Sequence, residues 1–212
     1  KTKIAAYIEG TDRHQEVALA RAQFLAALTE VLYRSGRIDV ETYQRELSAA
    51  FPPELDLSDS PEGLCHKAEA LSAFNAAIAE APQVSNAEEM ARLISLRWQA
   101  LTSALEALTA ASKLNDADNL AKIHLLRGDT EMSRWQLGRK PCNYPVAQQN
   151  AGTLLRNAQT YYRGAAGIAR RDGAPEEERE GVCKEALAAA IAGDSSKLEP
   201  LKQTAAQDLI AV

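Results

Sequence analysis

The sequence lacks the usual marks of a catalytic, metal-binding or membrane-spanning chain. No apolar run approaches the roughly 18 residues that a membrane span requires. No GxGxxG, phosphate-binding loop, GxSxG or HExxH motif occurs. Cys65 and His66 are neighbours, but adjacent side chains on a helix point about 100° apart and do not chelate one metal ion together. We therefore expect no membrane span, no metal, no cofactor and no catalytic residue.

Cysteine is scarce as well. The three cysteines are Cys65, Cys142 and Cys183, and none belongs to a CxxC pair. An odd, sparse set predicts free thiols and an intracellular, reducing compartment, the cytoplasm or the nucleus. The first residues, KTKIAAYIEGTDRH, contain no hydrophobic signal segment. Because the chain begins with lysine, we interpret it as trimmed, and the question of a removed targeting segment stays open.

Aromatic residues and prolines are few, whereas alanine is abundant. There are three phenylalanines, two tryptophans and eight prolines against 40 alanines in 212 residues. Strand-like alternation is nowhere sustained, so the predicted fold class is all-α, with helices packed at close range. We expect seven or eight helices arranged as antiparallel hairpins in one domain, 1–212. Within it, composition and turns outline four weaker units: 1–55, 56–116, 117–173 and 174–212.

Start and stop signals place the helices. Thr11 and Gly36 bound the first at 12–35, and its apolar face has helical spacing: Val17, Ala20, Phe24, Leu28 and Val31. Later starts are marked by Asp39, by Ser60 with Pro61, by a capping box of Ser85 and Glu88, and by Pro145 and Pro175. The helix after Ser85 runs unusually far, to Lys113. A fifth covers 118–137, the sixth runs from Pro145 to about 171, and a weaker helix follows Pro200.

A period of 34 residues is the signature of some stacked hairpins. Segment 22–55 has Leu25, Leu28 and Leu32 in its first helix, Gly36 in the turn and Pro53 at the close. The pattern A-x3-F-x2-A-x4-P is matched by Ala70, Phe74, Ala77 and Pro82, and 34 residues later stand Ala104, Leu108, Ala111 and Asp116. The chain thus resembles a divergent tetratricopeptide (TPR) repeat protein over about half its length.

The TPR pattern has two departures. Glu41 stands where the family has a small residue, and LISLRWQALTSAL lacks the turn between paired helices, so that long helix runs straight through. The resemblance implies an α-solenoid or right-handed superhelix that binds other proteins as an adaptor, a co-chaperone or a complex subunit. It implies no catalytic residue. The alternative is another kind of helical bundle.

Basic residues are concentrated in one region of an acidic chain. Between 119 and 171 nine basic side chains face two acidic ones, a balance of +7, so with a net charge of −5 the remainder carries −12. The basic residues are Lys122, Arg127, Arg134, Arg139, Lys140, Arg156, Arg163, Arg170 and Arg171. We expect this basic hairpin to be the surface on which an acidic partner docks.

Three of these arginines form a stripe. Arg156, Arg163 and Arg170 are seven residues apart, almost two helical turns, so they share one side of the sixth helix. The opposite side carries the apolar seam Ala147, Ala151, Leu154, Ala158, Tyr161, Ala165 and Ile168, widened by Leu155, Tyr162 and Ala169. The stripe is therefore a solvated face, useful either for solubility alone or for partner binding.

Arg127 and Arg134 stand among apolar neighbours on the fifth helix, whose packing seam is Ala121, Leu125, Gly128, Met132 and Trp135. They are either structural, paired with a carboxylate of an adjacent helix, or line a groove for an anionic partner. Four glycines, Gly128, Gly152, Gly164 and Gly167, are expected to permit close helix approach, because glycine inside a helix otherwise costs about 1 kcal/mol.

These observations lead to one preferred function and two alternatives. The preferred one is a scaffold or adaptor that binds a partner protein or acidic peptide through Arg127, Arg134, Arg156, Arg163 and Arg170. The first alternative is a helical enzyme or small-ligand carrier with a pocket near Tyr144, Tyr161 and Tyr162. The second is a nucleic-acid accessory subunit using the basic hairpin, which the acidic net charge makes the weaker choice.

Overall fold

Helices make up the fold. The computed structural model describes residues 2–52, 55–57, 60–80, 86–114, 119–138, 151–194, 196 and 198, with side chains from residue 15 onward. Seven helices and no strand occur in these ranges, which confirms the all-α prediction. They are α1 (Thr2–Arg34), α2 (Val40–Ala50), α3 (Pro61–Glu80), α4 (Ala87–Ala111), α5 (Leu120–Gly138), α7 (Ala151–Asp172) and α8 (Pro175–Ile191).

Local capping chemistry sets most of the boundaries. The Asp39 carboxylate accepts a hydrogen bond from the Thr42 amide at 2.8 Å and begins α2. The Ser60 hydroxyl accepts from the Gly63 amide at 3.0 Å at the start of α3. Gly36, with a φ of 70°, ends the first helical segment in the left-handed conformation that glycine adopts at little cost. These signals act within a few residues, which is why the sequence predicts them.

Two predicted starts are wrong. Helix α1 begins at Thr2 rather than after Thr11, because the helix-forming residues before Thr11 continue the same helix. Helix α4 is capped by Asn86, whose side chain accepts from the Glu88 amide at 2.9 Å, and not by Ser85. The predicted start of the sixth helix at Pro145 and the last helix after Pro200 lie outside the described residues.

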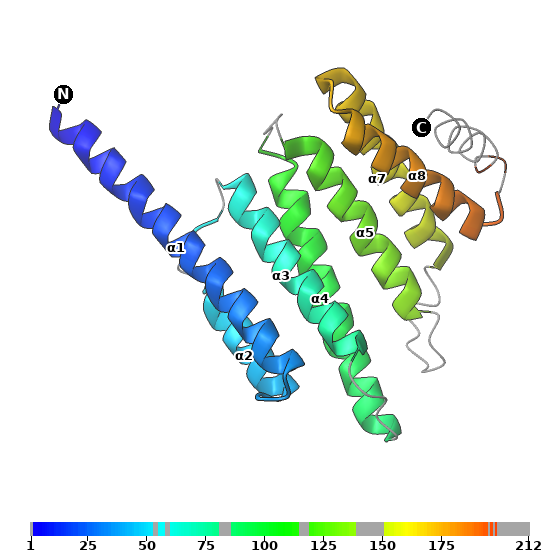
Figure 1. Cartoon of the computed structure of the whole chain (residues 1–212), viewed down its shortest axis with the longest axis horizontal. Helices are drawn as coiled ribbons and strands as arrows, with labels where there is room; N and C mark the ends of the chain where they lie inside the picture. The colour runs from blue at the N-terminus through cyan, green and yellow to red at the C-terminus, as the bar shows by residue number, and fades with distance from the viewer. Residues whose placement is uncertain are drawn as a thin grey trace, which may run out of the picture.

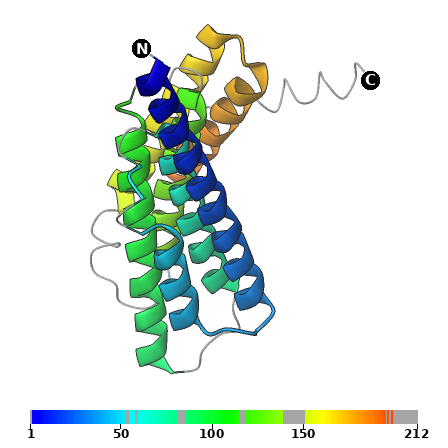
Figure 2. The same ribbon diagram turned by 90° about the vertical axis from the view of Figure 1, so that its left-hand side faces the viewer.

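The helices alternate in direction and lie side by side. In Figure 1 the order across the molecule is α1 and α2, then α3 and α4, then α5, then α7 and α8. The turned view in Figure 2 shows α1 in front, at one end of this array. Neighbours along the chain are neighbours in space, as short connections require. Antiparallel hairpins are thus present, while the TPR-like superhelix stays a prediction.

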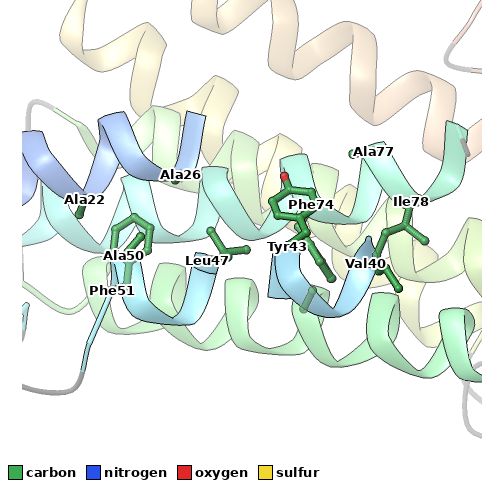
Figure 3. Packing of buried hydrophobic residues seen from close by; sticks show 11 residues of the cluster. Ala22, Ala26, Val40, Tyr43, Leu47, Ala50, Phe51, Phe74, Ala77 and Ile78 are labelled. Carbon is green, nitrogen blue, oxygen red and sulfur yellow. The ribbon is translucent and has the colours of Figure 1, made fainter. Parts of the chain in front are cut away.

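Aromatic rings anchor the first part of the core. Figure 3 shows Tyr43 and Phe74 from α2 and α3 among small aliphatic side chains of neighbouring helices. Their rings meet edge to face with centroids 4.8 Å apart, a favourable aromatic geometry. Further along, alanines dominate the buried positions of α4 and α7, including Ala104, Ala158 and Ala165, which have no exposed surface. Small side chains there let the helices approach closely.

The predicted seams have different outcomes. On α7, Leu154, Ala158 and Ala165 are buried and all three stripe arginines are exposed, as predicted. On α1 the opposite holds, since Val17, Phe24, Leu28 and Val31 are exposed. The side of α1 that packs on its neighbours carries Ala22, Ala26 and Thr29 instead. Spacing alone identified an apolar face of α1 but not which face the rest of the chain covers.

The helix glycines also divide into two kinds. At Gly128 a side chain would collide with the Tyr162 ring, and at Gly164 an added Cβ would lie 3.1 Å from Nδ1 of His124. These two permit close approach, as predicted. At Gly152 and Gly167 nothing lies within 4 Å of an added Cβ, so the prediction is wrong for both.

Two alanine substitutions exploit this difference. We expect Gly128→Ala to destabilise the fold by about 1–3 kcal/mol, because the new methyl group overpacks against Tyr162. Gly167→Ala should instead stabilise it by up to about 1 kcal/mol, because alanine is the better helix former and the site is open. Urea unfolding measures both free energies. Equal effects of the two substitutions would contradict the contact between α5 and α7.

Candidate partner-binding surface

Arg127 joins three helices. From α5, its guanidinium donates to the Tyr161 hydroxyl of α7 at 2.9 Å and to the Ser112 hydroxyl beyond α4 at 3.3 Å. The charged carbon lies 4.1 Å from the centre of the Tyr161 ring, within the range of a cation–π contact. Arg127 is half-buried and is therefore a cross-link between helices. Its acceptors are neutral hydroxyl oxygens, whereas the predicted structural role would pair Arg127 with a carboxylate.

Arg134 is paired with a carboxylate, but one of its own helix. It donates to Glu131 at 3.0 Å, and Glu131 is only 2% exposed. The second Glu131 oxygen accepts from the Asn157 amide of α7 at 3.0 Å. On its other side Arg134 stacks over the Trp98 ring of α4 at 4.5 Å. Sequence reasoning missed Glu131, because nothing in its spacing distinguishes a buried glutamate from a surface one.

The arginine stripe of α7 faces solvent and α8. Arg163 pairs with Glu185 at 2.8 Å and Arg170 with Glu178 at 2.7 Å, both across the hairpin to α8. Arg156 makes only weak contacts with its own helix, to the Gly152 carbonyl at 3.3 Å and the Thr153 hydroxyl at 3.4 Å. The arginine of each pair is exposed, whereas Glu185 is only 13% exposed. The stripe is thus partly neutralised at two of its three positions.

A third polar group ties α5, α7 and α8 together. Asp129 accepts from the Tyr162 hydroxyl at 2.8 Å and pairs with Lys184 at 2.7 Å. Lys184 also pairs with Glu180. Burial by itself lowers the pKa of Lys184, but the hydrogen bonds to Asp129 and Glu180 outweigh it and raise that pKa. Burial raises the pKa of Tyr162 strongly, with Asp129 adding to the effect, so the phenol stays protonated and donates.

His124 occupies the same contact region in its neutral form. Burial, reinforced by the positive charge of Arg127, lowers the pKa of His124 below its usual value of 6.5. Its ring lies edge-on to Tyr161, with centroids 6.1 Å apart. Nδ1 of His124 is buried and has no hydrogen-bond partner among the described residues. A second proton, which would give the ring a positive charge, is therefore unfavourable in the folded protein.

The basic hairpin therefore has much less unpaired positive charge on its surface than its composition suggests. Lys122 adds a further pair, with Glu69 of α3 at 3.0 Å. Arg139 and Lys140 lie outside the described residues, as does Tyr144 of the expected ligand pocket. Tyr161 and Tyr162 face Arg127 and Asp129. Most of the described basic side chains in this region thus contact the chain's own acidic or aromatic residues.

A groove lies between α2, α3 and α4, and sequence reasoning did not find it. It opens to solvent and has a volume of about 360 Å³. Its apolar side chains are Leu47, Phe51, Leu71, Phe74, Leu96 and Ala100. Its polar side chains are Gln44, Ser48, Lys67, Gln99 and Ser103. Because the lining comes from three helices, the groove has no signature in any single stretch of sequence.

Comparison with known proteins yields no matching family model, no matching curated protein and no matching solved structure. The resemblance to TPR proteins accordingly remains a prediction. In the described part of the chain, no three His, Cys, Asp or Glu side chains are grouped so that they could hold a metal ion. No helix there has both the length and the apolar character to cross a bilayer. Neither of the two cysteines with described side chains, Cys65 and Cys183, is in a disulfide.

Two arginine substitutions separate structural from surface roles. We expect Arg134→Met to lower the free energy of unfolding by about 3–5 kcal/mol, because it leaves the buried Glu131 carboxylate without its cation. Arg170→Met should change it by no more than about 0.5 kcal/mol, since Arg170 is 69% and its partner Glu178 30% exposed. Chemical denaturation checks the difference. Similar losses in the two variants would refute the structural role of Arg134.

His124 predicts a specific pH dependence. The folded-state pKa lies below the unfolded value of 6.5, so the unfolded chain binds the proton first and stability falls as the pH drops from about 7 towards the folded pKa. We expect the melting temperature to fall less over this interval in His124→Gln than in the parent. Gly167→Ala, which changes no titratable group, is the control and should keep the parental slope. An unchanged slope in His124→Gln would contradict the assignment.

Proposed function

We propose that this protein is a binding scaffold for a partner protein or peptide with an acidic segment, rather than an enzyme. It would act as an adaptor, a co-chaperone or a subunit of a larger assembly. The observation that carries the proposal is the open groove between α2, α3 and α4. We place the binding site in the groove and give the exposed stripe arginines of α7 a role in long-range attraction only.

The groove has the composition of a peptide-binding surface. Leu71 and Leu96, both partly exposed, offer apolar contact, while Gln44 and Gln99 supply donors and acceptors for a partner backbone. Lys67 is the charged group of the lining. A partner that places an apolar side chain in the groove and a carboxylate near Lys67 would satisfy both kinds of contact.

The arginines then take different parts. Arg127 and Arg134 support the scaffold by holding α4, α5 and α7 together. Arg156, Arg163 and Arg170 remain exposed, so we propose that they attract an acidic partner at long range. Surface charges of this kind mainly change the association rate, and salt screens them over a Debye length of about 10 Å at 0.1 M.

Two observations favour the scaffold over the alternatives. A ligand carrier needs a closed pocket with converging polar groups, and the groove described above opens to solvent. A nucleic-acid subunit needs an extended positive surface, and the chain as a whole carries a net charge of −5. We also propose an intracellular, reducing compartment, which the absence of a disulfide at Cys65 and Cys183 supports.

Site-specific photo-crosslinking in native extract tests the proposal. We expect a photoreactive residue at Gln99 to capture a protein partner, because Gln99 lies at the groove and is exposed. Glu106, exposed on the same helix about two turns away, is the control position and should not capture it. Capture of the same partner at both positions, or at Glu106 only, would refute the groove as the binding site.

Charge reversal then tests the acidic character of the partner that is captured. Lys67→Glu should weaken its affinity by about tenfold, the effect of losing one charge-assisted contact of roughly 1.4 kcal/mol. Lys113→Glu changes an exposed lysine outside the groove and should leave the affinity within about twofold. Titration calorimetry measures both. Equal affinities of the two variants would contradict the role of Lys67.

A further inference from the structure

The outer face of α1 is an exposed apolar surface. Val17 is 68% exposed, Phe24 66%, Leu28 41% and Val31 61%, and these four include the most exposed large hydrophobic side chains of the described chain. Single exposed hydrophobic residues are normal on a protein surface, but a continuous apolar row marks an interaction site. The row follows one side of α1 over about 21 Å.

Helix α1 is apolar on two opposite sides. Its inner side places Ala22, Leu25 and Ala26 against α2 and α3. Its outer side faces away from the array, and Figure 2 shows no described helix over it. A helix with apolar residues on both sides is ordinarily covered on both. Terminal helices of stacked arrays normally have a polar outer face, which α1 does not.

The outer row has the spacing of a coiled coil. Val17, Phe24 and Val31 are seven residues apart and occupy equivalent a positions of a heptad, with exposed Ala20 and Ala27 at the d positions between them. Val17 and Val31 are β-branched, as a positions of two-stranded parallel coils commonly are, and alanine at d lets two helix axes come close. Such a seam is complementary to a copy of itself.

Charge selects the orientation of that copy. Glu16 precedes the seam at a g position and Arg21 lies at the following e position, and both are exposed. In a parallel pair, g of one helix faces the next e of the other, so Glu16 and Arg21 attract each other across the contact twice. An antiparallel pair instead brings g positions next to g positions and e positions next to e positions. Depending on the register, it places Glu16 near Glu30 of the other copy or Arg21 near its own equivalent.

We propose that α1 pairs with α1 of a second copy as a parallel two-stranded coiled coil, forming a symmetric homodimer. The helix is already held in place by its inner face, so pairing does not require the ordering that short coiled-coil peptides need. Because the described seam covers about two heptads, we expect a dissociation constant in the roughly micromolar range. No α1 residue lines the α2–α3–α4 groove, so the dimer would present two open grooves.

Sedimentation equilibrium of the full chain, from roughly 1 to 100 µM, tests the association. We expect a reversible monomer–dimer equilibrium that Phe24→Glu weakens at least tenfold. Leu187→Glu is the matched control, since Leu187 is a 54% exposed residue at the opposite end of the array, on α8. A monomer at every concentration would overturn the proposal. So would species larger than a dimer that Leu187→Glu abolishes, because those indicate head-to-tail packing of α1 on α8.

The orientation has its own test. Glu16→Lys should weaken the dimer a few-fold, and the double variant Glu16→Lys with Arg21→Glu should restore it, because the swap recreates both attractive pairs. In a Cys142→Ser and Cys183→Ser background, which leaves only the buried Cys65, Val17→Cys should form a disulfide between copies under mild oxidation, since equivalent a positions face each other in a parallel pair. A dimer that shows neither rescue nor this disulfide would overturn the parallel pairing.

Discussion

Tyr162 is the side chain on which the second half of the molecule depends. Its ring lies against Gly128 of α5, where a side chain would collide with it. An added Cβ at Gly181 of α8 would lie 2.9 Å from the Tyr162 carbonyl oxygen, so α8 also approaches this turn of α7 closely. The Tyr162 hydroxyl donates to Asp129, which in turn holds Lys184 of α8. Gly128, Gly181 and Asp129 thus hold α5, α7 and α8 together around Tyr162.

The same close packing explains what happens to the basic residues. When α4, α5 and α7 approach each other, the side chains between them must find partners or lose the free energy of hydration. Arg127 and Arg134 find tyrosine, tryptophan, serine and a buried glutamate. A region that is strongly basic in composition therefore becomes part of the scaffold. Binding in this account falls to the groove of the first hairpins and, for self-association, to α1.

Helix existence and most boundaries could be predicted from the sequence, because Asp39, Gly36 and Pro175 act on their own neighbourhoods. The buried seam of α7 could be predicted because α7 is strongly amphipathic. Its apolar residues lie together on the side that packs against neighbouring helices. The exposed face of α1 could not, since periodicity reports an apolar face without reporting what covers it. The groove and the Glu131 pair depend on contacts between helices, and no local pattern encodes them.

The central claim is that partners bind in the groove and not on the arginine stripe. Hydroxyl-radical footprinting of the purified complex with its partner tests this directly, because it reports the exposure of individual side chains. The account predicts that Leu71 and Leu96, both partly exposed in the groove, lose reactivity in the complex. Arg156 and Arg163 of the stripe, both exposed, should keep their reactivity. Protection of Arg156 and Arg163 with unchanged Leu71 and Leu96 would contradict the account.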